Sequence, residues 1–408
     1  MKVTKYKICV IGLGYVGLPL AVALSKKYSV VGFDINSKRV DSLKNNIDST
    51  LELSSEELMS AGNILYTHKK EDIVDSEIYI VTVPTPIDDN NTPDLNPVIK
   101  ASELLGGVIS YNNIVIYEST VYPGATEEVC VPILRDTSGL EYNKEFFVGY
   151  SPERINPGDK NNRLENIKKV TSGSTVETAN IVDSIYSSII NAGTFKASSI
   201  KVAESSKIIE NVQRDVNIAL INEFHQILSC LNINTVDVIE AASTKWNFMK
   251  LHPGLVGGHC ISVDPYYLIH KSQSVGYIPD LIKKSREINN GMPSFVVNDF
   301  IKKLILNKIN PIELKVVVLG FSFKPNCPDV RNTKVFDVYN LLIKNGFNVI
   351  VYDPIVDKEE VFEEYGIDVI TSISEIDFND YTVSFIGTEH NDFNELSKEF
   401  KFTYNFKS

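Results

Sequence analysis

The residue best suited to covalent chemistry is Cys260, which lies in the stretch HPGLVGGHCISVDPYYL at residues 252–268. Two glycines precede it closely, and glycines permit backbone conformations and close approaches that side chains would forbid. An exposed cysteine with a lowered pKa is a nucleophile, and Asp264 follows four residues later. We therefore interpret Cys260 as a candidate nucleophile. The alternatives are a buried structural cysteine and, less favoured because zinc ligands usually occur as spaced pairs, a metal site with His259 and Asp264.

Polar and charged side chains in other segments could complete a site around such a thiol. Lys207 and Asn211 are four apart in AESSKIIEN (203–211), so a helix would place them on one face. Turns that we expect after strands or at loop tips carry Thr85, Thr120, Glu153, Arg154, Lys324, Arg331 and Lys334. Hydroxyls and carboxylates there could orient a ligand or a water, and the cationic turn suits a phosphate group. The alternative for each segment is a solvated helix face or ordinary turn chemistry.

A glycine-rich motif near the N-terminus predicts a bound dinucleotide. GLGYVG follows the apolar strand YKICVIG and opens a helix, and Asp34 ends the next strand 22 residues after Gly12. In that context the three glycines make a tight turn, admit a pyrophosphate and allow close helix packing; a glycine-rich turn in another α/β protein is the alternative. Asp34 would bind a ribose 2′-OH and repel a 2′-phosphate, which favours NAD over NADP, and Arg39 tempers this preference. The candidate cofactor-binding residues here are Gly12, Gly14, Tyr15, Val16, Gly17, Asp34 and Arg39.

Strand and helix patterns alternate at both ends of the chain. The apolar strands YKICVIG, YSVVGFD, EIYIVTVP and NNIVIYEST, with helix-like segments between them, are typical of a doubly wound parallel sheet. From about residue 200 apolar residues recur near helical spacing, and no strand pattern returns before LKVVVLGFSFKP at about 314. Residues 7–34 and 315–353 therefore look like two copies of one βαβ unit, the second without the glycine motif.

The length of 408 residues exceeds what one hydrophobic core usually organises. We predict an α/β protein with two Rossmann-like doubly wound domains joined by a central helical domain with a long connecting helix. The expected boundaries are 1–199 for the first domain, 200–310 for the helical domain and 311–408 for the last.

Composition and charge argue against several classes of protein. The formal net charge of −12 disfavours a nucleic-acid-binding surface or a polybasic membrane patch, so an anionic ligand would need a local cluster of Lys and Arg. We find no run of about 20 apolar residues that would predict a transmembrane span. The five cysteines are scattered and lack CxxC spacing, which argues against a disulfide framework and a zinc site. We expect a protein of the reducing cytoplasm with no metal, no nucleic-acid partner and no membrane insertion.

With these motifs assembled, the chain resembles the UDP-glucose/GDP-mannose dehydrogenase family over essentially its whole length. The matching segments, in the order of the family, are GLGYVGLP, VPTPID, YESTVYPG, SPERINPGD, AESSKIIEN, PGLVGGHCISVDP and GFSFKPNCPDVRNT. GGHCISVDPYYL resembles the branch acting on UDP-N-acetylhexosamines, and STKWNFMKLHPGLVGGHC looks similar to bacterial UDP-N-acetylglucosamine 6-dehydrogenases of the Vi-antigen type.

The resemblance implies an N-terminal NAD-binding domain, a central helical domain that forms a homodimer or higher homo-oligomer, and a C-terminal domain that holds UDP. The active site would lie in the cleft between the end domains. The implied reaction is a four-electron oxidation of the sugar C6 alcohol to a carboxylate with two NAD⁺, in surface polysaccharide biosynthesis. The sugar epimer stays open, with UDP-N-acetylmannosamine, UDP-N-acetylgalactosamine and UDP-glucose as alternatives.

The resemblance also assigns roles to matching residues. The catalytic set is Cys260, Lys207, Asp264, Asn211, Thr120 and Glu153. The thiolate would hold the aldehyde as a thiohemiacetal and then a thioester, Lys207 with Asn211 would stabilise an oxyanion, and Asp264 would position or deprotonate water. Substrate-binding residues would be Glu153, Arg154, Lys207, Asn211, His252, Gly257 and Lys324, and Thr85, Thr120 and Arg331 would join the cofactor-binding set. Relatives place a basic residue from the partner subunit upstream of the cysteine, but the spacing of Lys245 does not settle whether it is equivalent.

Two other functions are compatible with parts of the pattern. A two-electron NAD-dependent hydroxyacid dehydrogenase would use Lys207 and leave Cys260 as packing. A non-catalytic nucleotide-sugar or NAD-binding module would form no NADH. The joint presence of a cysteine, lysine, asparagine and aspartate disfavours the binding module, because binding alone does not need them.

Overall fold

The computed structural model describes residues 6–62, 64–88, 90–155, 163–312 and 314–407. Its chain divides into two units: residues 1–210 with 266–274, and residues 211–265 with 275–408. Within the described ranges, no helix is long and apolar enough to cross a membrane.

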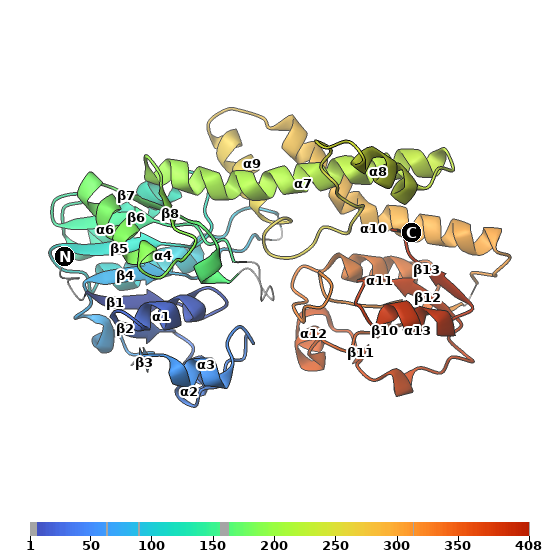
Figure 1. The fold of residues 1–408 in the computed structure, drawn as a ribbon, viewed down its shortest axis with the longest axis horizontal. Coiled ribbons are helices and arrows are strands. Elements are labelled where there is room, and N and C mark those ends of the chain that lie inside the picture. The colour runs from blue at the N-terminus through green and yellow to red at the C-terminus, as the bar shows by residue number, and fades with distance from the viewer. Residues whose placement is uncertain (1–5, 63, 89, 156–162, 313, 408) are drawn as a thin grey trace. The chain divides into compact units, whose positions relative to one another are not determined.

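The first unit is built around an eight-stranded sheet (Figure 1). Its strands are β1 (Lys7–Ile11), β2 (Ser29–Phe33), β3 (Ile64–Thr67), β4 (Ile78–Val81), β5 (Asn113–Tyr117), β6 (Phe146–Tyr150), β7 (Lys169–Gly173) and β8 (Thr194–Lys196). Its helices are α1 (Gly17–Ser25), α2 (Ser37–Lys44), α3 (Ser55–Ser60), α4 (Asn96–Gly106), α5 (Val131–Ser138) and α6 (Val176–Ser187). The strands lie in the order β3-β2-β1-β4-β5-β6-β7-β8, and neighbouring strands are parallel except for β6 and β7. β1 and β4 are also parallel, but the chain builds the sheet outward from β1 on one side and from β4 on the other, so the strand order reverses between them. In doubly wound sheets, ligands bind outside the carboxyl ends of the strands at that point.

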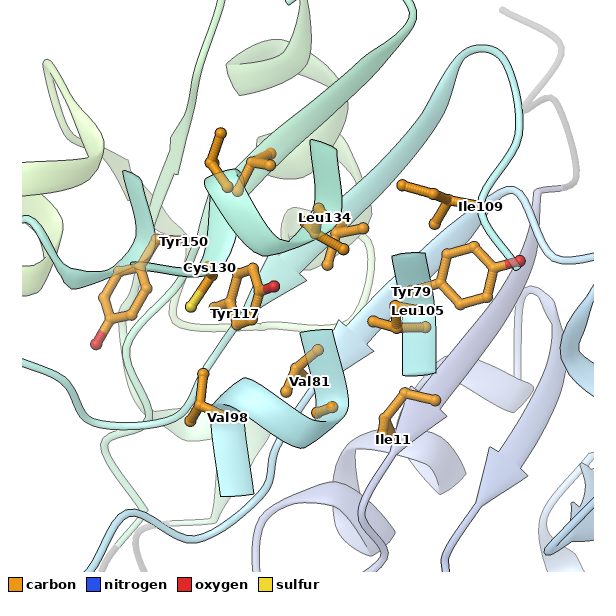
Figure 2. Close-up of a cluster of buried hydrophobic side chains, with 14 of the residues drawn as sticks. Ile11, Tyr79, Val81, Val98, Leu105, Ile109, Tyr117, Cys130, Leu134 and Tyr150 are labelled. Atoms are coloured by element: carbon orange, nitrogen blue, oxygen red, sulfur yellow. The ribbon is translucent and has the colours of Figure 1, made fainter. Parts of the chain in front are cut away.

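The continuous apolar strands arise because both faces of this sheet are covered. In β1, Cys9 and Ile11 lie in one core cluster with α4 and α5, while Ile8 and Val10 lie in the other with α1 and α6. Burying each such side chain contributes about 1.5–3 kcal/mol. Figure 2 shows part of the first cluster, where labelled side chains from the strands meet Val98 and Leu105 of α4 and Leu134 of α5.

The second unit contains a five-stranded parallel sheet of order β11-β10-β9-β12-β13. Its strands are β9 (Lys315–Leu319), β10 (Asn348–Tyr352), β11 (Val369–Ile370), β12 (Val383–Ile386) and β13 (Phe402–Tyr404). Helices α11 (Lys334–Lys344), α12 (Lys358–Tyr365) and α13 (Phe393–Leu396) connect them. The predicted α/β fold with two doubly wound sheets is confirmed.

The two sheets repeat one local design after their first strands. Gly12 and Gly320 both have positive φ, +90° and +85°, and both pack against backbone that follows a neighbouring strand. Asp34 accepts a hydrogen bond from the N–H of Leu13 at 2.8 Å, and Asp353 accepts one from the N–H of Phe321 at 2.8 Å. The second copy buries its aspartate completely, against His390 at 3.0 Å.

The middle of the chain is helical, as predicted. It contains α7 (Ile200–Cys230), α8 (Thr235–Ser243), α9 (Asp264–Ser274) and α10 (Asp280–Leu306), and no strand lies in the described residues 197–312. In the second unit, buried Asp215 of α7 pairs with buried Arg286 of α10 at 2.5 Å and accepts from Asn289 at 2.7 Å. Polar pairing therefore joins the two long helices there. The division into two units does not test the three predicted domain boundaries, which stay a prediction.

Candidate functional site

The glycine turn of the first unit has the form that a dinucleotide requires. Gly17 packs so tightly that an added Cβ would lie 1.8 Å from the carbonyl oxygen of Gly12, whereas a Cβ on Gly14 would meet nothing within 4 Å. The middle glycine therefore borders open space at the N-terminal end of α1, where N–H groups and the helix dipole attract a pyrophosphate. Val16 is the half-buried N-cap residue of α1 and Tyr15 is half-buried beside it. These residues fit an NAD cofactor.

Arg39 braces this turn from inside the protein. Its guanidinium donates to the carbonyl oxygen of Leu13 at 2.9 Å and pairs with Asp48 at 2.8 Å, and the side chain is buried. The carboxylate of Asp34 accepts hydrogen bonds from the N–H groups of Leu13 and Asn36. The guanidinium of Arg39 thus makes contacts within the fold, and its expected effect on the preference for NAD remains a prediction.

Exchanging single glycines of the turn for alanine will separate ligand space from folding. Gly14→Ala will leave stability within about 1 kcal/mol, because its Cβ enters open space, but will raise the KM for NAD at least about tenfold by blocking the pyrophosphate. Gly17→Ala will lower stability by about 1–3 kcal/mol or more through overpacking. Thermal unfolding and NAD titration of both variants measure the two effects. Equal KM values for Gly14→Ala and the parent would contradict the cofactor assignment.

The turns that carry Thr85 and Thr120 are fixed by contacts within the first unit. Tyr267 of α9 donates to the carbonyl oxygen of Thr85 at 2.9 Å, and Ser119 donates to the carbonyl oxygen of Val83 at 2.6 Å. Both threonines are half-buried. Their predicted contacts with cofactor or substrate remain predictions.

Glu204 is a residue that the sequence analysis missed. It is completely buried on α7, three residues before Lys207, and its carboxylate accepts from the N–H groups of Gly124 and Thr126. Burial raises the pKa of Glu204 to about 7, against the effect of these hydrogen bonds. The carboxylate thus ties α7 to the turn that follows Thr120, and only the position of Glu204 one helical turn before a candidate lysine could have indicated it.

The segment after β6 contacts the same helix. Arg154 pairs with Glu210 of α7 and donates to the carbonyl oxygen of Lys168 at 3.0 Å. Glu153 is buried and accepts from the N–H groups of Arg154 and Ile155. The structure therefore gathers Glu153, Arg154 and the Lys207 turn of α7 in one unit. The rest of SPERINPGD, residues 156–159, lies outside the described residues.

In the second unit, Asp264 is bonded to Asn211. Asn211 donates from Nδ2 to Oδ2 of Asp264 at 2.5 Å, and Asp264 is buried as the first residue of α9. The N–H of Asp264 also donates to the carbonyl oxygen of Cys260 at 2.8 Å, so the half-buried cysteine and the aspartate share one turn. This arrangement joins three of the predicted catalytic residues.

The glycine stretch before Cys260 is clamped on two sides. Buried Asn222 of α7 accepts from the N–H of Gly254 at 2.9 Å and donates to its carbonyl oxygen at 3.0 Å. On the other side, Gly257 lies so close to Asn332 that a Cβ would stand 2.6 Å from that carbonyl oxygen, and Gly258 has φ +83°. Side chains are therefore excluded there for packing reasons, and His252 is exposed at the start of the stretch.

The cationic turn of the second unit is partly neutralised by its own aspartate. Arg331 donates to both oxygens of Asp329 at 2.9 and 2.7 Å, and His259 lies 3.6 Å from the same carboxylate. Although burial opposes it, Arg331 and His259 hold the pKa of Asp329 well below its usual range. Lys324 is half-buried, with Nζ 5.5 Å from the centre of the Phe323 ring. The predicted phosphate contacts of this turn remain predictions.

The five cysteines all lie within the described residues and form no disulfide with one another. Among the residues placed by the structure, no three His, Cys, Asp or Glu side chains gather in a way that could hold a metal ion.

Comparison with known proteins gives matches along nearly the entire chain. Three models of the UDP-glucose/GDP-mannose dehydrogenase family match in succession: the NAD binding domain at residues 6–190, the central domain at 201–291 and the UDP binding domain at 317–405. A UDP-N-acetyl-D-glucosamine 6-dehydrogenase of Salmonella typhi is 53% identical over 97% of this chain and 93% of its own. One of the same description from Pseudomonas aeruginosa is 53% identical over 96% and 92%.

A solved structure agrees with these matches. The UDP-D-ManNAc dehydrogenase of Pyrococcus horikoshii superposes with a TM-score of 0.87 at 29% identity, covering 98% of this chain and 96% of that one. Sequence and structure thus match along nearly the full length, with an NAD-binding domain first and a UDP-binding domain last. The chain belongs to the UDP-glucose/GDP-mannose dehydrogenase family.

Proposed function

We propose that this protein is an NAD-dependent UDP-N-acetylglucosamine 6-dehydrogenase, which converts the C6 alcohol of the sugar to a carboxylate. The observation that carries the proposal is the turn that joins Cys260 to the Asn211–Asp264 pair, in a chain 53% identical to two proteins of that description. A nucleophile beside a positioned carboxylate suits formation and hydrolysis of an acyl intermediate.

The residues divide the work of a four-electron oxidation. The glycine turn would hold NAD⁺, which would supply the hydride acceptor for both oxidations at C6, and the proton of the C6 hydroxyl goes to solvent in the first. After the first, the thiolate of Cys260 adds to the aldehyde carbon and holds it as a thiohemiacetal; after the second, the same sulfur carries a thioester. Lys207 with Asn211 stabilises negative charge on the sugar oxygen. Asp264, held by Asn211, receives a proton from the water that releases the carboxylate and restores the thiol.

The remaining assignments extend this proposal. Thr85 and Thr120 contact cofactor or substrate, and Lys324 and Arg331 contact phosphates. The three parts 1–199, 200–310 and 311–408 serve as the NAD-binding, helical and UDP-binding domains, in keeping with the family models. A catalytic thiol and a diffusible NAD pool suit the reducing cytoplasm.

We propose further that α7 forms a homodimer with a second copy of this chain. Leu220, Phe224 and Ile227 of α7 and Leu231, which directly follows the helix, are all exposed, 44–60% of each. The spacing of four and three residues puts the first three on one helix face. A contiguous apolar stripe of this kind is typical of a protein interface.

A charge placed in the stripe will dissociate the dimer. Phe224→Asp will raise the dimer dissociation constant at least about 100-fold, because burying an unpaired carboxylate costs several kcal/mol. Phe362→Asp is the matched control, since Phe362 is similarly exposed on α12 away from the stripe. Light scattering after size exclusion measures both. A Phe224→Asp protein that stays dimeric would show that another surface forms the contact.

The activity itself is tested by a panel of UDP- and GDP-sugars with NAD⁺. UDP-N-acetylglucosamine should give two NADH per sugar consumed and a uronic acid product. One NADH per sugar would support a two-electron dehydrogenase, and binding without NADH would support a non-catalytic module. Faster turnover of an epimer would reassign the substrate within the family.

A further inference from the structure

Four side chains that the mechanism above leaves largely unused form a buried cluster in the first unit. Lys169, the first residue of β7, donates to Glu118 at 2.7 Å and to Glu153 at 2.9 Å. Tyr186 of α6 donates its hydroxyl to the other oxygen of Glu118, and its ring lies 5.4 Å from Nζ of Lys169. The side chains of Glu118, Lys169 and Glu153 are 0%, 2% and 10% exposed.

The cluster is close in sequence to candidate site residues and lies at the same edge of the sheet. Glu118 follows β5 and precedes Thr120 by two residues, and Glu153 follows β6. β5 and β6 are parallel neighbours, so both carboxylates lie at the carboxyl edge of the sheet, where ligands bind. The cluster therefore connects the turns that carry Thr120 and Glu153.

Glu153 has few lone pairs left for chemistry. One of its oxygens accepts from the backbone N–H groups of Arg154 and Ile155, and the other accepts from Lys169. Although burial opposes ionisation, the charge of Lys169 and these hydrogen bonds hold the pKa of Glu153 below its usual value. A carboxylate with a lowered pKa is a weak proton acceptor near neutral pH, but it can still orient a water.

Glu118 differs from Glu153 in its protonation, because the cluster contains two carboxyl groups and one ammonium group. With both carboxylates ionised, the buried cluster would carry one ammonium and two negative charges, and low-dielectric surroundings disfavour a net charge. Burial raises the pKa of Glu118 to about 7, and the nearby charge of Glu153 adds to this, while Lys169 and Tyr186 oppose it. Those three are the charged or titratable groups that the structure places against Glu118, from β7, α6 and the end of β6.

We infer that Lys169 and Glu118 are positioning residues for the reaction: Lys169 fixes Glu153 as a carboxylate that orients water without accepting its proton, and Glu118 is the member of the cluster that exchanges a proton. The inference rests on the proposed function for its link to turnover. The protonation of Glu118 does not depend on it, because the cluster is complete within one unit.

Thermal unfolding as a function of pH tests the proton exchange without any substrate. A raised folded-state pKa means that Glu118 contributes stability fully below its unfolded pKa of about 4.5, and that this contribution is lost as pH rises through about 7. Glu118→Gln keeps an acceptor for Tyr186 and Lys169 but cannot ionise. The parent should therefore lose Tm relative to Glu118→Gln between pH 5 and 8, by on the order of 5 °C. Parallel Tm curves would overturn the role of Glu118.

Kinetics test the positioning role. Glu118→Gln should match the parent below about pH 6, where both clusters are neutral, and diverge from it above pH 8. Lys169→Met should lower kcat about 100-fold and leave the KM for NAD unchanged. Lys169→Arg should keep kcat within about tenfold of the parent, because a guanidinium can bridge both carboxylates. If Lys169→Met does not fold, the Arg variant and the pH series still decide the matter. A parent-like kcat in folded Lys169→Met, or identical pH profiles for Glu118→Gln and the parent, would contradict the inference.

Failure of the proposed function would look different. In that case the parent would turn over no nucleotide sugar, while the Tm series would still report on Glu118.

Discussion

Replacing Cys260 by serine is expected to reduce uronic acid formation by at least about 10³-fold while NAD binding stays unchanged. A serine hydroxyl has nearly the size of the thiol but does not ionise near neutral pH, and without a general base on it the hydroxyl is a weak nucleophile. The aldehyde would then not be captured for the second hydride transfer. NAD titration, NADH release and mass spectrometry of the sugar product measure the three quantities.

The control for this variant is another cysteine-to-serine change. Cys230 is exposed at the end of α7, so Cys230→Ser should leave activity and stability at parent values. Uronic acid formed by Cys260→Ser at the rate of the parent would exclude the covalent route. It would then favour a two-electron enzyme or direct hydration of the aldehyde.

The fold could be predicted from sequence where one strand or helix carries its own signal. YKICVIG is apolar throughout because both faces of β1 are covered, and the helical spacing from residue 200 correctly predicts α7. The strands β3, β6, β7 and β8 of the first sheet and β11, β12 and β13 of the second were not identified. The direction of a strand is set by its partners across the sheet, and four residues carry too little periodic pattern to reveal one.

Some residues of the candidate site could likewise be predicted from the sequence, and others could not. The glycines, Cys260 and Asp264 could be named because their types and local spacing indicate chemistry. Glu204, Asn222 and Lys169 could not, because each acts through partners tens of residues away, such as the pair of Lys169 and Glu118. A positively charged residue in the sequence does not by itself predict a phosphate contact, because Arg331 is paired with Asp329 in the same turn.

Asp264→Asn is expected to stop the reaction at its last chemical step. The amide keeps the shape of the carboxylate and can still meet Asn211, but it carries no charge and cannot take a proton from water. Both hydride transfers would proceed, so each active site would release two NADH in a burst and then stall. Steady-state turnover should fall about 10²–10⁴-fold. Stopped-flow absorbance measures the burst, and Asp136→Asn, at an exposed ion pair with Arg135 on α5, is the matched control.

The stalled protein should carry the sugar acid on its own cysteine. Because the N–H of Asp264 donates to the carbonyl oxygen of Cys260, the side chain of residue 264 stays beside the sulfur in the variant. Intact-mass analysis of quenched Asp264→Asn should therefore show one thioester per chain, and the double change with Cys260→Ser should show none. A first NADH as slow as the steady state would instead place Asp264 in the initial oxidation, since the burst distinguishes hydrolysis from hydride transfer.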